Sequence, residues 1–162
     1  MNRTLTHRGP DAEEYYKNKH VLLGHQRLAI IDLQGGNQPM TKQGNTIVYN
    51  GEIYNASEIR EKLMAYGHSF NTTSDTEVLL TAYIQWKEKC VDFLNGIFAF
   101  AIWNEQDEAF FLCRDRLGVN PLFYQQLASG ILVSSEIKGL LLLRVCQQCI
   151  AMLKIFLTLK FI

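Results

Sequence analysis

The dipeptide Asn50-Gly51 is the first candidate for chemistry in this sequence. An asparagine amide and the backbone N–H of the next glycine can donate to one oxygen, and a glycine lets a ligand approach the backbone closely. The pair could therefore stabilise the oxyanion of an acyl-transfer reaction. Between two alternating apolar runs, the same dipeptide also predicts a type I′ hairpin turn that joins strands over residues 46–50 and 52–54. A second Asn-Gly follows at residues 95–96, so both interpretations stay open.

Two charged residues could hold a ligand of opposite charge. Arg27 lies between apolar residues of an extended segment, where a buried guanidinium needs an acidic partner. That partner is either Asp32, in a salt bridge, or the carboxylate of a bound ligand; alternatively, Arg27 lies at a sheet edge and extends its charged group into solvent. Asp75 lies in the first turn of a predicted helix, where the helix dipole alone favours a negative charge. It could equally hold an ammonium group.

The four cysteines form no recognisable reactive or metal-binding pattern. Cys90 closes a predicted helix and Cys113 lies in an apolar strand, and neither setting activates a thiolate. Cys146 and Cys149 have the spacing of half a zinc site, but no second pair and no downstream histidine completes it. We therefore predict no metal site. A cysteine hydrolase that pairs Cys90 or Cys113 with a histidine is the weakest of the functional hypotheses.

Composition argues against several classes of protein. The 162 residues carry 16 basic and 16 acidic side chains, and no long run of like charge, which argues against a nucleic-acid-binding protein. A hydrophobic content of 48% and a charged content of 20% fit one globular domain. The first residues lack the apolar core of a signal peptide, and charged residues interrupt the apolar stretch 140–162. We therefore predict a cytoplasmic protein that does not span a membrane.

Two helices are predicted where a capping signal precedes an apolar periodicity. The first follows Asn55 and ends at Gly67, a residue that readily adopts the left-handed conformation of a helix end. The second follows the capping box of Ser74 and Glu77 and continues to about Lys89. Asp75 would then lie at the start of this second helix.

Short apolar runs predict the strands of the fold. The run over residues 97–103 is apolar on both sides, as in a central strand covered on both faces. Further strands are predicted over residues 21–23, 28–30, 109–113, 122–126 and 131–134. Because hairpins outnumber strand-helix-strand units, we predict an α+β fold of antiparallel sheets with helices on their outer faces. Residues 143–162 lose turn signals and surface charge, and we predict that they form an apolar tail after a domain over residues 1–142.

Several motifs occur together and in order. They are HRGPD (7–11), GHQRLAIIDL (24–33), GGNQPM (35–40), YNGEIYN (49–55), SDTEVLL (74–80), LNGIFAFAIW (94–103), RDRLGVNPLFY (114–124) and SSEIKGLL (134–141). This set resembles the glutaminase domain of glutamine-hydrolysing asparagine synthetases, which are class II glutamine amidotransferases. The resemblance covers about residues 5–142 and implies a fold like that of N-terminal-nucleophile hydrolases, a four-layer αββα sandwich of antiparallel sheets.

The resemblance also implies a glutamine site. The residues that match the family's motif are Arg27, Leu28, Ala29, Ile30, Ile31, Asn50, Gly51, Glu52 and Asp75. Arg27 would hold the α-carboxylate of glutamine, with residues 28–31 lining that side. Glu52 and Asp75 would receive the α-amino group. The site would thus be complementary to a zwitterion.

In this family the thiolate of an N-terminal cysteine attacks the side-chain amide of glutamine, and ammonia leaves as a thioester forms. Asn50 and Gly51 would then form the oxyanion hole. The sequence begins with Met1-Asn2-Arg3, so the resemblance implies that the family's first strand and its nucleophile are missing. We expect the chain to be inactive alone. The alternative function is a non-catalytic glutamine-binding or interaction remnant.

The family's synthetase domain has no counterpart in this sequence. By resemblance, that domain uses ATP and Mg²⁺ to amidate aspartate to asparagine, so no cofactor is expected in this chain. Glutamine is the expected small-molecule partner, and a synthetase domain is the expected protein partner in full-length relatives. Truncation at both ends would expose strand edges and apolar surface, which predicts self-association.

Overall fold

The computed structural model describes residues 5, 7, 9, 12–27, 36–128, 130–141, 150–152 and 156–160. The strands are β1 (Ala12–Lys17), β2 (Leu22–Arg27), β3 (Met40–Lys42), β4 (Asn45–Ile53), β5 (Gly96–Asn104), β6 (Ala109–Arg114), β7 (Phe123–Leu127), β8 (Gly130–Ser134), β9 (Ile150–Met152) and β10 (Phe156–Lys160). The helices are α1 (Ala56–Ala65), α2 (Asp75–Trp86), the 3₁₀ segment η2 (Lys87–Phe93) and α3 (Ile137–Leu141).

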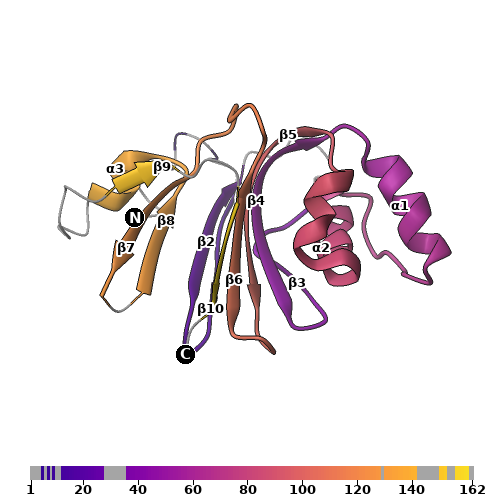
Figure 1. Cartoon of the computed structure of the whole chain (residues 1–162), viewed down its shortest axis with the longest axis horizontal. Helices are drawn as coiled ribbons and strands as arrows, with labels where there is room; N and C mark the ends of the chain where they lie inside the picture. Colours follow the sequence, from indigo (N-terminus) through magenta and orange to yellow (C-terminus); the bar gives the residue numbers. More distant parts are fainter. Residues whose placement is uncertain are drawn as a thin grey trace.

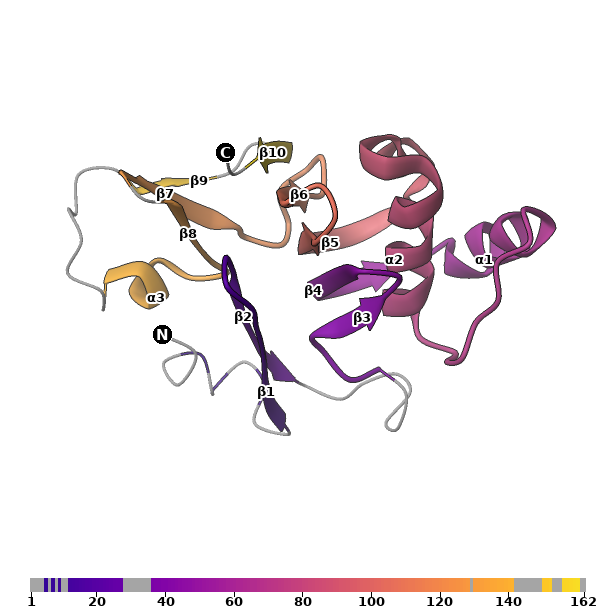
Figure 2. The same cartoon turned by 90° about the horizontal axis from the view of Figure 1, so that it is seen from below.

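The described strands form three antiparallel sheets. The largest has the order β10-β6-β5-β4-β3, and the two smaller ones are β8-β7-β9 and β1-β2. Figure 1 shows α1 and α2 on one side of the large sheet and β2, β7 and β8 on the other, with α3 beyond β7 and β8. Figure 2 shows the same succession of layers from below. The predicted α+β class and its αββα layering are confirmed, although two separate sheets make up the second strand layer.

The central strand β5 is buried on both faces, as its composition predicts. Phe100 and Ile102 belong to the core between the large sheet and the helices. Ala99, Ala101 and Trp103 belong to the core on the opposite face of the sheet. All five side chains are almost fully buried, and removing a large apolar side chain from water contributes about 1.5–3 kcal/mol. β5 therefore provides a rigid support for its neighbour β4.

The first predicted helix is confirmed, but the role predicted for Asn55 is wrong. The Asn55 side chain makes no capping hydrogen bond to α1. Its amide instead donates to the carbonyl oxygen of Phe93 at 2.9 Å and accepts from the N–H of Asn95 at 2.9 Å. These bonds join the start of α1 to the segment that leads into β5. Gly67 ends the helix region with a φ of 89°, as predicted.

The second predicted helix begins with one half of the predicted capping box, because the N–H of Ser74 donates to the hydroxyl of Thr72 and not to Glu77. The Ser74 hydroxyl oxygen accepts from the N–H of Glu77 at 3.3 Å, so α2 starts at Asp75. The helix ends at Trp86, three residues before the predicted end at Lys89, and the chain continues as the 3₁₀ segment η2. The cap matters for the site because it fixes Asp75 as the first residue of α2.

The hairpin predicted at Asn50-Gly51 is wrong. β4 runs without interruption through both residues, and Gly51 pairs with Phe98 of β5. The turn of the hairpin lies instead at Gln43 and Gly44, which join β3 to β4. Their φ values of 48° and 71° are those of a type I′ turn. The interpretation of Asn50-Gly51 as part of a ligand site therefore does not compete with a turn.

The structure also differs from the predicted strands near the two ends of the chain. β1 was not predicted, because its side chains are mostly exposed and follow no clear apolar alternation. β2 runs through Gly24 as one strand, and the strand predicted over residues 28–30 lies outside the described residues. In the tail, β9 pairs with β7 and β10 pairs with β6. The division into residues 1–142 and 143–162 stays a prediction. No helix in the described ranges is long and apolar enough to cross a membrane.

Candidate functional site

The second half of β4 has one edge that no described strand covers. β3 pairs only with Asn45–Ile47, whereas β5 pairs with the whole of β4. The N–H of Tyr54, just after β4, donates to the carbonyl oxygen of Asn95 at 2.8 Å. Because alternate residues of an antiparallel ladder bond to the same neighbour, the even-numbered residues of β4 face β5. Residues 49, 51 and 53 direct their backbone groups to the opposite edge, which we call the open edge of β4.

Side chains from two other segments occupy both ends of the open edge. The N–H of Tyr49 donates to Oε1 of Gln38 at 2.6 Å, and the N–H of Ile53 donates to Oδ2 of Asp75 at 3.2 Å. The N–H of Gly51 lies between them and points to the same edge by the same alternation. Asn50 and Gly51 are exposed, as is Glu52. A small ligand can therefore reach a backbone donor at Gly51 from solvent.

Asp75 is held over this edge by two hydrogen bonds to one of its oxygens. Oδ2 accepts from the hydroxyl of Tyr49 at 2.7 Å as well as from the N–H of Ile53. Among the described residues, none donates to the other oxygen, Oδ1. Burial of Tyr49 and the charge of Asp75 raise the pKa of the tyrosine well above its usual value, so its hydroxyl remains a donor. Within the described part of the chain, Oδ1 of Asp75 is thus left without a hydrogen-bond donor, and the exposed stretch 50–52 lies between the two residues that bind Oδ2.

Gln38 and His25 attach two further segments to the open edge. The buried Gln38 donates through Nε2 to the hydroxyl of Thr76 at 3.3 Å, which ties β4 to the first turn of α2. Nε2 of His25 lies 3.2 Å from the carbonyl oxygen of Tyr49, which ties β2 to β4. β2 ends at Arg27, two residues after His25. The end of β2 is therefore brought to the same edge.

The remaining predicted site residues lie outside the part of the chain that the structure describes. They are the Arg27 side chain and the residues Leu28, Ala29, Ile30 and Ile31. The structure thus brings Asp75 to the part of β4 that contains Asn50, Gly51 and Glu52, although α1 and at least 23 positions of sequence separate Asp75 from these three residues. His25, two residues before Arg27 in β2, contacts the same edge at Tyr49.

Asp115 organises a loop that reaches the other side of the Asn50-Gly51 peptide. Its buried carboxylate accepts backbone N–H bonds from Phe98 at 3.3 Å, Val119 at 2.9 Å and Asn120 at 3.0 Å. Burial would raise the pKa of Asp115, but these backbone donors outweigh it and lower the pKa below the usual range. The loop presents the Asn120 side chain, whose Nδ2 donates to the carbonyl oxygen of Asn50 at 3.2 Å.

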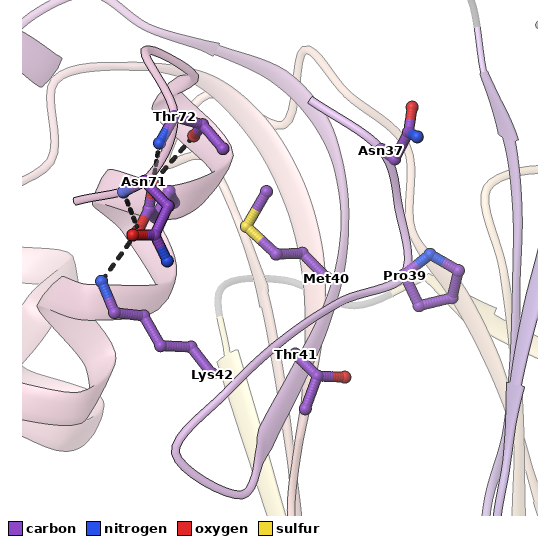
Figure 3. A pocket seen from close by; sticks show the side chains of 8 residues that line it. Asn37, Pro39, Met40, Thr41, Lys42, Asn71 and Thr72 are labelled. Atoms are coloured by element: carbon purple, nitrogen blue, oxygen red, sulfur yellow. Dashed lines mark hydrogen bonds and ion pairs between the residues drawn. The ribbon is translucent and has the colours of Figure 1, made fainter. Parts of the chain in front are cut away.

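A pocket of about 300 Å³ lies between β3 and the loop before α2. Figure 3 shows its lining residues, which are Asn37, Pro39, Met40, Thr41, Lys42, Asn71, Thr72 and Glu77. The buried Glu77 accepts from Nζ of Lys42 at 2.9 Å, and its oxygens also accept the N–H groups of Asn71 and Thr72 at 2.7–3.0 Å. The charges in the pocket wall are therefore already paired. This ion pair fixes the loop that precedes Asp75.

The Glu77 ion pair makes stability depend on pH. Burial would raise the pKa of Glu77, but hydrogen bonds from Lys42, Asn71 and Thr72 outweigh it and lower the pKa below 4.5. Glu77 therefore stabilises the fold above about pH 4.5, and this contribution is lost as pH falls through the lowered value. We expect Glu77→Gln to reduce the free energy of unfolding by about 1–3 kcal/mol at pH 7. The difference from wild type should shrink as pH falls below 4.5.

Urea unfolding at several pH values measures this difference. The exposed Glu61 on α1 offers a matched control, and Glu61→Gln should change the free energy of unfolding by less than about 0.5 kcal/mol. A difference between wild type and Glu77→Gln that stays constant as pH falls below 4.5 would contradict the expectation.

The described cysteines do not belong to the site. Cys90 and Cys113 are fully buried in the core between the large sheet and the helices. Burial raises the pKa of Cys113 to about 12, with a further contribution from Asp115, and burial raises the pKa of Cys90 even further. Neither thiol is a nucleophile at neutral pH, which argues against the cysteine hydrolase hypothesis.

Cys146 and Cys149 lie outside the described residues. Within the described ranges, no cluster of three or more His, Cys, Asp or Glu is placed to hold a metal ion.

Comparison with curated proteins finds relatives that are named glutamine-hydrolysing asparagine synthetases. An asparagine synthetase (glutamine-hydrolyzing) 3 of Bacillus subtilis is 54% identical over 145 residues, which are 87% of this chain and 24% of the relative. Asparagine synthetase 1 of the same organism is 46% identical over 87% of this chain and 23% of the relative. Asparagine synthetase 1 of Arabidopsis thaliana is 43% identical over 86% and 24%. The chain thus spans about a quarter of the length of these relatives.

Two solved structures, both of enzymes, share the fold of this chain. Glutamine phosphoribosylpyrophosphate amidotransferase from B. subtilis, complexed with ADP and GMP, matches with a TM-score of 0.64 and 22% identity over 81% of this chain and 34% of its own. An allosteric regulatory enzyme of purine biosynthesis matches with a TM-score of 0.66 and 23% identity over 86% and 33%. The family described as glutamine amidotransferase domain matches residues 1–161. The chain belongs to the glutamine amidotransferase domain family.

Proposed function

We propose that this chain binds glutamine at the open edge of β4 and is the glutamine-hydrolysing part of an asparagine synthetase. The observation that carries the proposal is the meeting of the Gly51 N–H and the Asp75 carboxylate at one exposed edge. The names of the relatives support it, because each is a glutamine-hydrolysing asparagine synthetase. In such a protein, the ammonia released from glutamine would amidate aspartate in a linked synthetase domain. ATP and Mg²⁺ would act there, and no step assigned to this chain uses them.

Glutamine fits the open edge as a zwitterion with an amide at its far end. Arg27 would pair with the α-carboxylate, and Asp75 with Glu52 would accept hydrogen bonds from the α-ammonium group. The side-chain amide oxygen would accept from the Gly51 N–H and from the Asn50 side chain. Arg27, Asp75 and Glu52 would thus meet the charged α-carbon end of glutamine, and Asn50 with Gly51 would meet its amide end.

Hydrolysis needs a thiolate in addition to this site. The thiolate would attack the amide carbon, and the negative charge that develops on the oxygen would be stabilised at Asn50 and Gly51. Ammonia would leave with a proton as the thioester forms, and water would then release glutamate. The buried Cys90 and Cys113 cannot supply the thiolate. Among the described residues no thiol is therefore placed to act on a ligand at the open edge of β4, and the non-catalytic alternative keeps glutamine binding without turnover.

Calorimetric titration tests the site with matched ligands and variants. L-glutamine should bind more tightly than glutaramate, which lacks the α-amino group, and more tightly than 4-aminobutanamide, which lacks the carboxylate. Asp75→Asn should weaken glutamine binding and leave glutaramate binding unchanged, whereas Arg27→Ala should weaken binding of both. Charge-assisted hydrogen bonds contribute about 1.5–3 kcal/mol, which corresponds to roughly a 10- to 150-fold change in Kd.

The exposed Asp92 provides the control, since Asp92→Asn removes a carboxylate that lies outside the site. Its Kd for glutamine should equal that of the wild type. Equal Kd values for glutamine in wild type, Asp75→Asn and Arg27→Ala would remove the proposed site. Release of ammonia by the 162-residue polypeptide at an enzymatic rate would show instead that another group in the chain supplies the nucleophile.

A further inference from the structure

We infer that Asn120 is a positioning residue that strengthens the Gly51 N–H as an oxyanion donor. This inference rests on the proposed function, because it concerns the same site. Asn120 donates from Nδ2 to the carbonyl oxygen of Asn50 at 3.2 Å. The same nitrogen lies 3.0 Å from the point that a β-carbon on Gly51 would occupy. Asn120 therefore lies directly against the peptide group that joins Asn50 to Gly51.

The bond acts on one end of a peptide group whose other end faces the ligand. The Asn50 carbonyl is directed toward β5, and the Gly51 N–H of the same peptide is directed to the open edge. A donor at the carbonyl oxygen draws electron density from the peptide nitrogen, so the N–H becomes a better donor. Such cooperative strengthening is roughly 10–30% per hydrogen bond. The bond also resists rotation of the peptide away from the edge.

Asn120 is held in place by contacts that do not involve a ligand. Its own N–H donates to Oδ2 of Asp115 at 3.0 Å, and the same oxygen accepts from the N–H of Phe98 at 3.3 Å. Phe98 is the β5 residue that pairs with Gly51. Pro121 follows Asn120 and restricts it to extended backbone conformations. One carboxylate thus aligns the Asn120 loop with the strand position opposite Gly51.

Isotope labelling isolates this peptide group in the protein. Asn-Gly occurs in the chain only at residues 50–51 and 95–96. With asparagine labelled at the carbonyl ¹³C and glycine labelled with ¹⁵N, a carbonyl-to-amide correlation spectrum therefore contains two cross peaks. One reports the Asn50-Gly51 peptide, and the other reports Asn95-Gly96 as an internal reference. The spectrum needs neither ligand nor turnover.

Replacement of Asn120 with alanine, or with leucine of similar size, removes the donor and keeps the backbone bonds to Asp115. In both variants we expect the Asn50 carbonyl ¹³C and the Gly51 ¹⁵N to move to lower chemical shift, whereas the Asn95-Gly96 peak stays in place. Asn71→Ala is the control, because Asn71 is exposed and its hydrogen bonds involve only its backbone N–H. It should move neither peak.

An unmoved Asn50-Gly51 peak in Asn120→Ala and Asn120→Leu would overturn the inference. Equal movement of both peaks would also overturn it, because it would reveal a general change in the sheet. The outcome is independent of glutamine, so a chain that fails to bind glutamine and still shows the selective shift would retain the Asn120 contact and lose the proposed function.

Discussion

Replacing Gly51 with alanine is expected to reduce the free energy of unfolding by at least about 3 kcal/mol and to abolish glutamine binding. Gly51 has a φ of 146°, a conformation that residues with a side chain rarely adopt. A β-carbon there would lie 2.1 Å from the carbonyl oxygen of Ile97 and 2.7 Å from the α-carbon of Phe98. Both are backbone atoms of the paired central strand β5, so they cannot move aside. β4 would have to separate from β5 at the ligand site.

Gly44 provides the control that separates backbone strain from collision. It has a φ of 71° in the β3–β4 turn, and a β-carbon there would meet no atom within 4 Å. Gly44→Ala should therefore reduce the free energy of unfolding by only about 1–2 kcal/mol, with glutamine affinity unchanged. Urea unfolding and calorimetric titration of both variants measure the two quantities. Equal losses of stability at Gly51 and Gly44 would contradict the close approach of β4 and β5.

Replacing Asp115 with alanine is expected to reduce the free energy of unfolding by about 3–5 kcal/mol. The change leaves the N–H groups of Phe98, Val119 and Asn120 without their acceptor, and Phe98 is buried in β5. Leaving one buried donor unsatisfied costs about 1–3 kcal/mol, although solvent near the exposed Val119 will satisfy part of this set. The Asn120 side chain should also lose its alignment with the Asn50-Gly51 peptide.

Asp115→Asn should be milder than Asp115→Ala, because its remaining oxygen can still accept the two bonds that Oδ2 accepts in the wild type. The exposed Asp92 again provides a control, and Asp92→Ala should change the free energy of unfolding by less than about 0.5 kcal/mol. Because the pKa of Asp115 is lowered, the difference between wild type and Asp115→Asn should be present at neutral pH. It should decline as pH falls below 3.8. Guanidinium unfolding curves that coincide for wild type and Asp115→Ala would rule out this role.

Local signals in the sequence predict the elements well where one capping group or one apolar pattern decides the structure. Ser74 caps α2 as predicted, and the doubly apolar run of β5 is buried on both faces. Asn50-Gly51 shows where such signals fail. This dipeptide favours a tight turn, but here all of β4 pairs with β5 and the strand continues through it. The paired residues are far apart in the sequence, so no local signal shows this pairing. At Gln43 and Gly44 the turn forms with a weaker local signal.

The sequence predicts several residues of the candidate site. It does not predict the hydrogen bonds that hold them in place. Residue chemistry alone makes Asn50, Gly51 and Asp75 candidates but leaves a purely structural interpretation open for each, and Glu52 is a candidate only through the family resemblance. The roles of Gln38, Tyr49 and Asn120 depend on hydrogen bonds over 11, 26 and 70 positions of sequence, which no local pattern encodes. The sequence around Asp115 does contain a local signal for its role. An aspartate at the start of a glycine-containing loop commonly accepts N–H bonds from the residues that follow.

The most direct test of the site is to titrate the protein, labelled at its two Asn-Gly peptides, with L-glutamine. Binding at the open edge of β4 predicts that the Asn50-Gly51 cross peak moves progressively and saturates, while the Asn95-Gly96 peak stays in place. The same titration of Asp75→Asn should need a higher glutamine concentration for half-saturation. Two peaks that remain unmoved at the highest glutamine concentration, or that move together, would contradict glutamine binding at this edge.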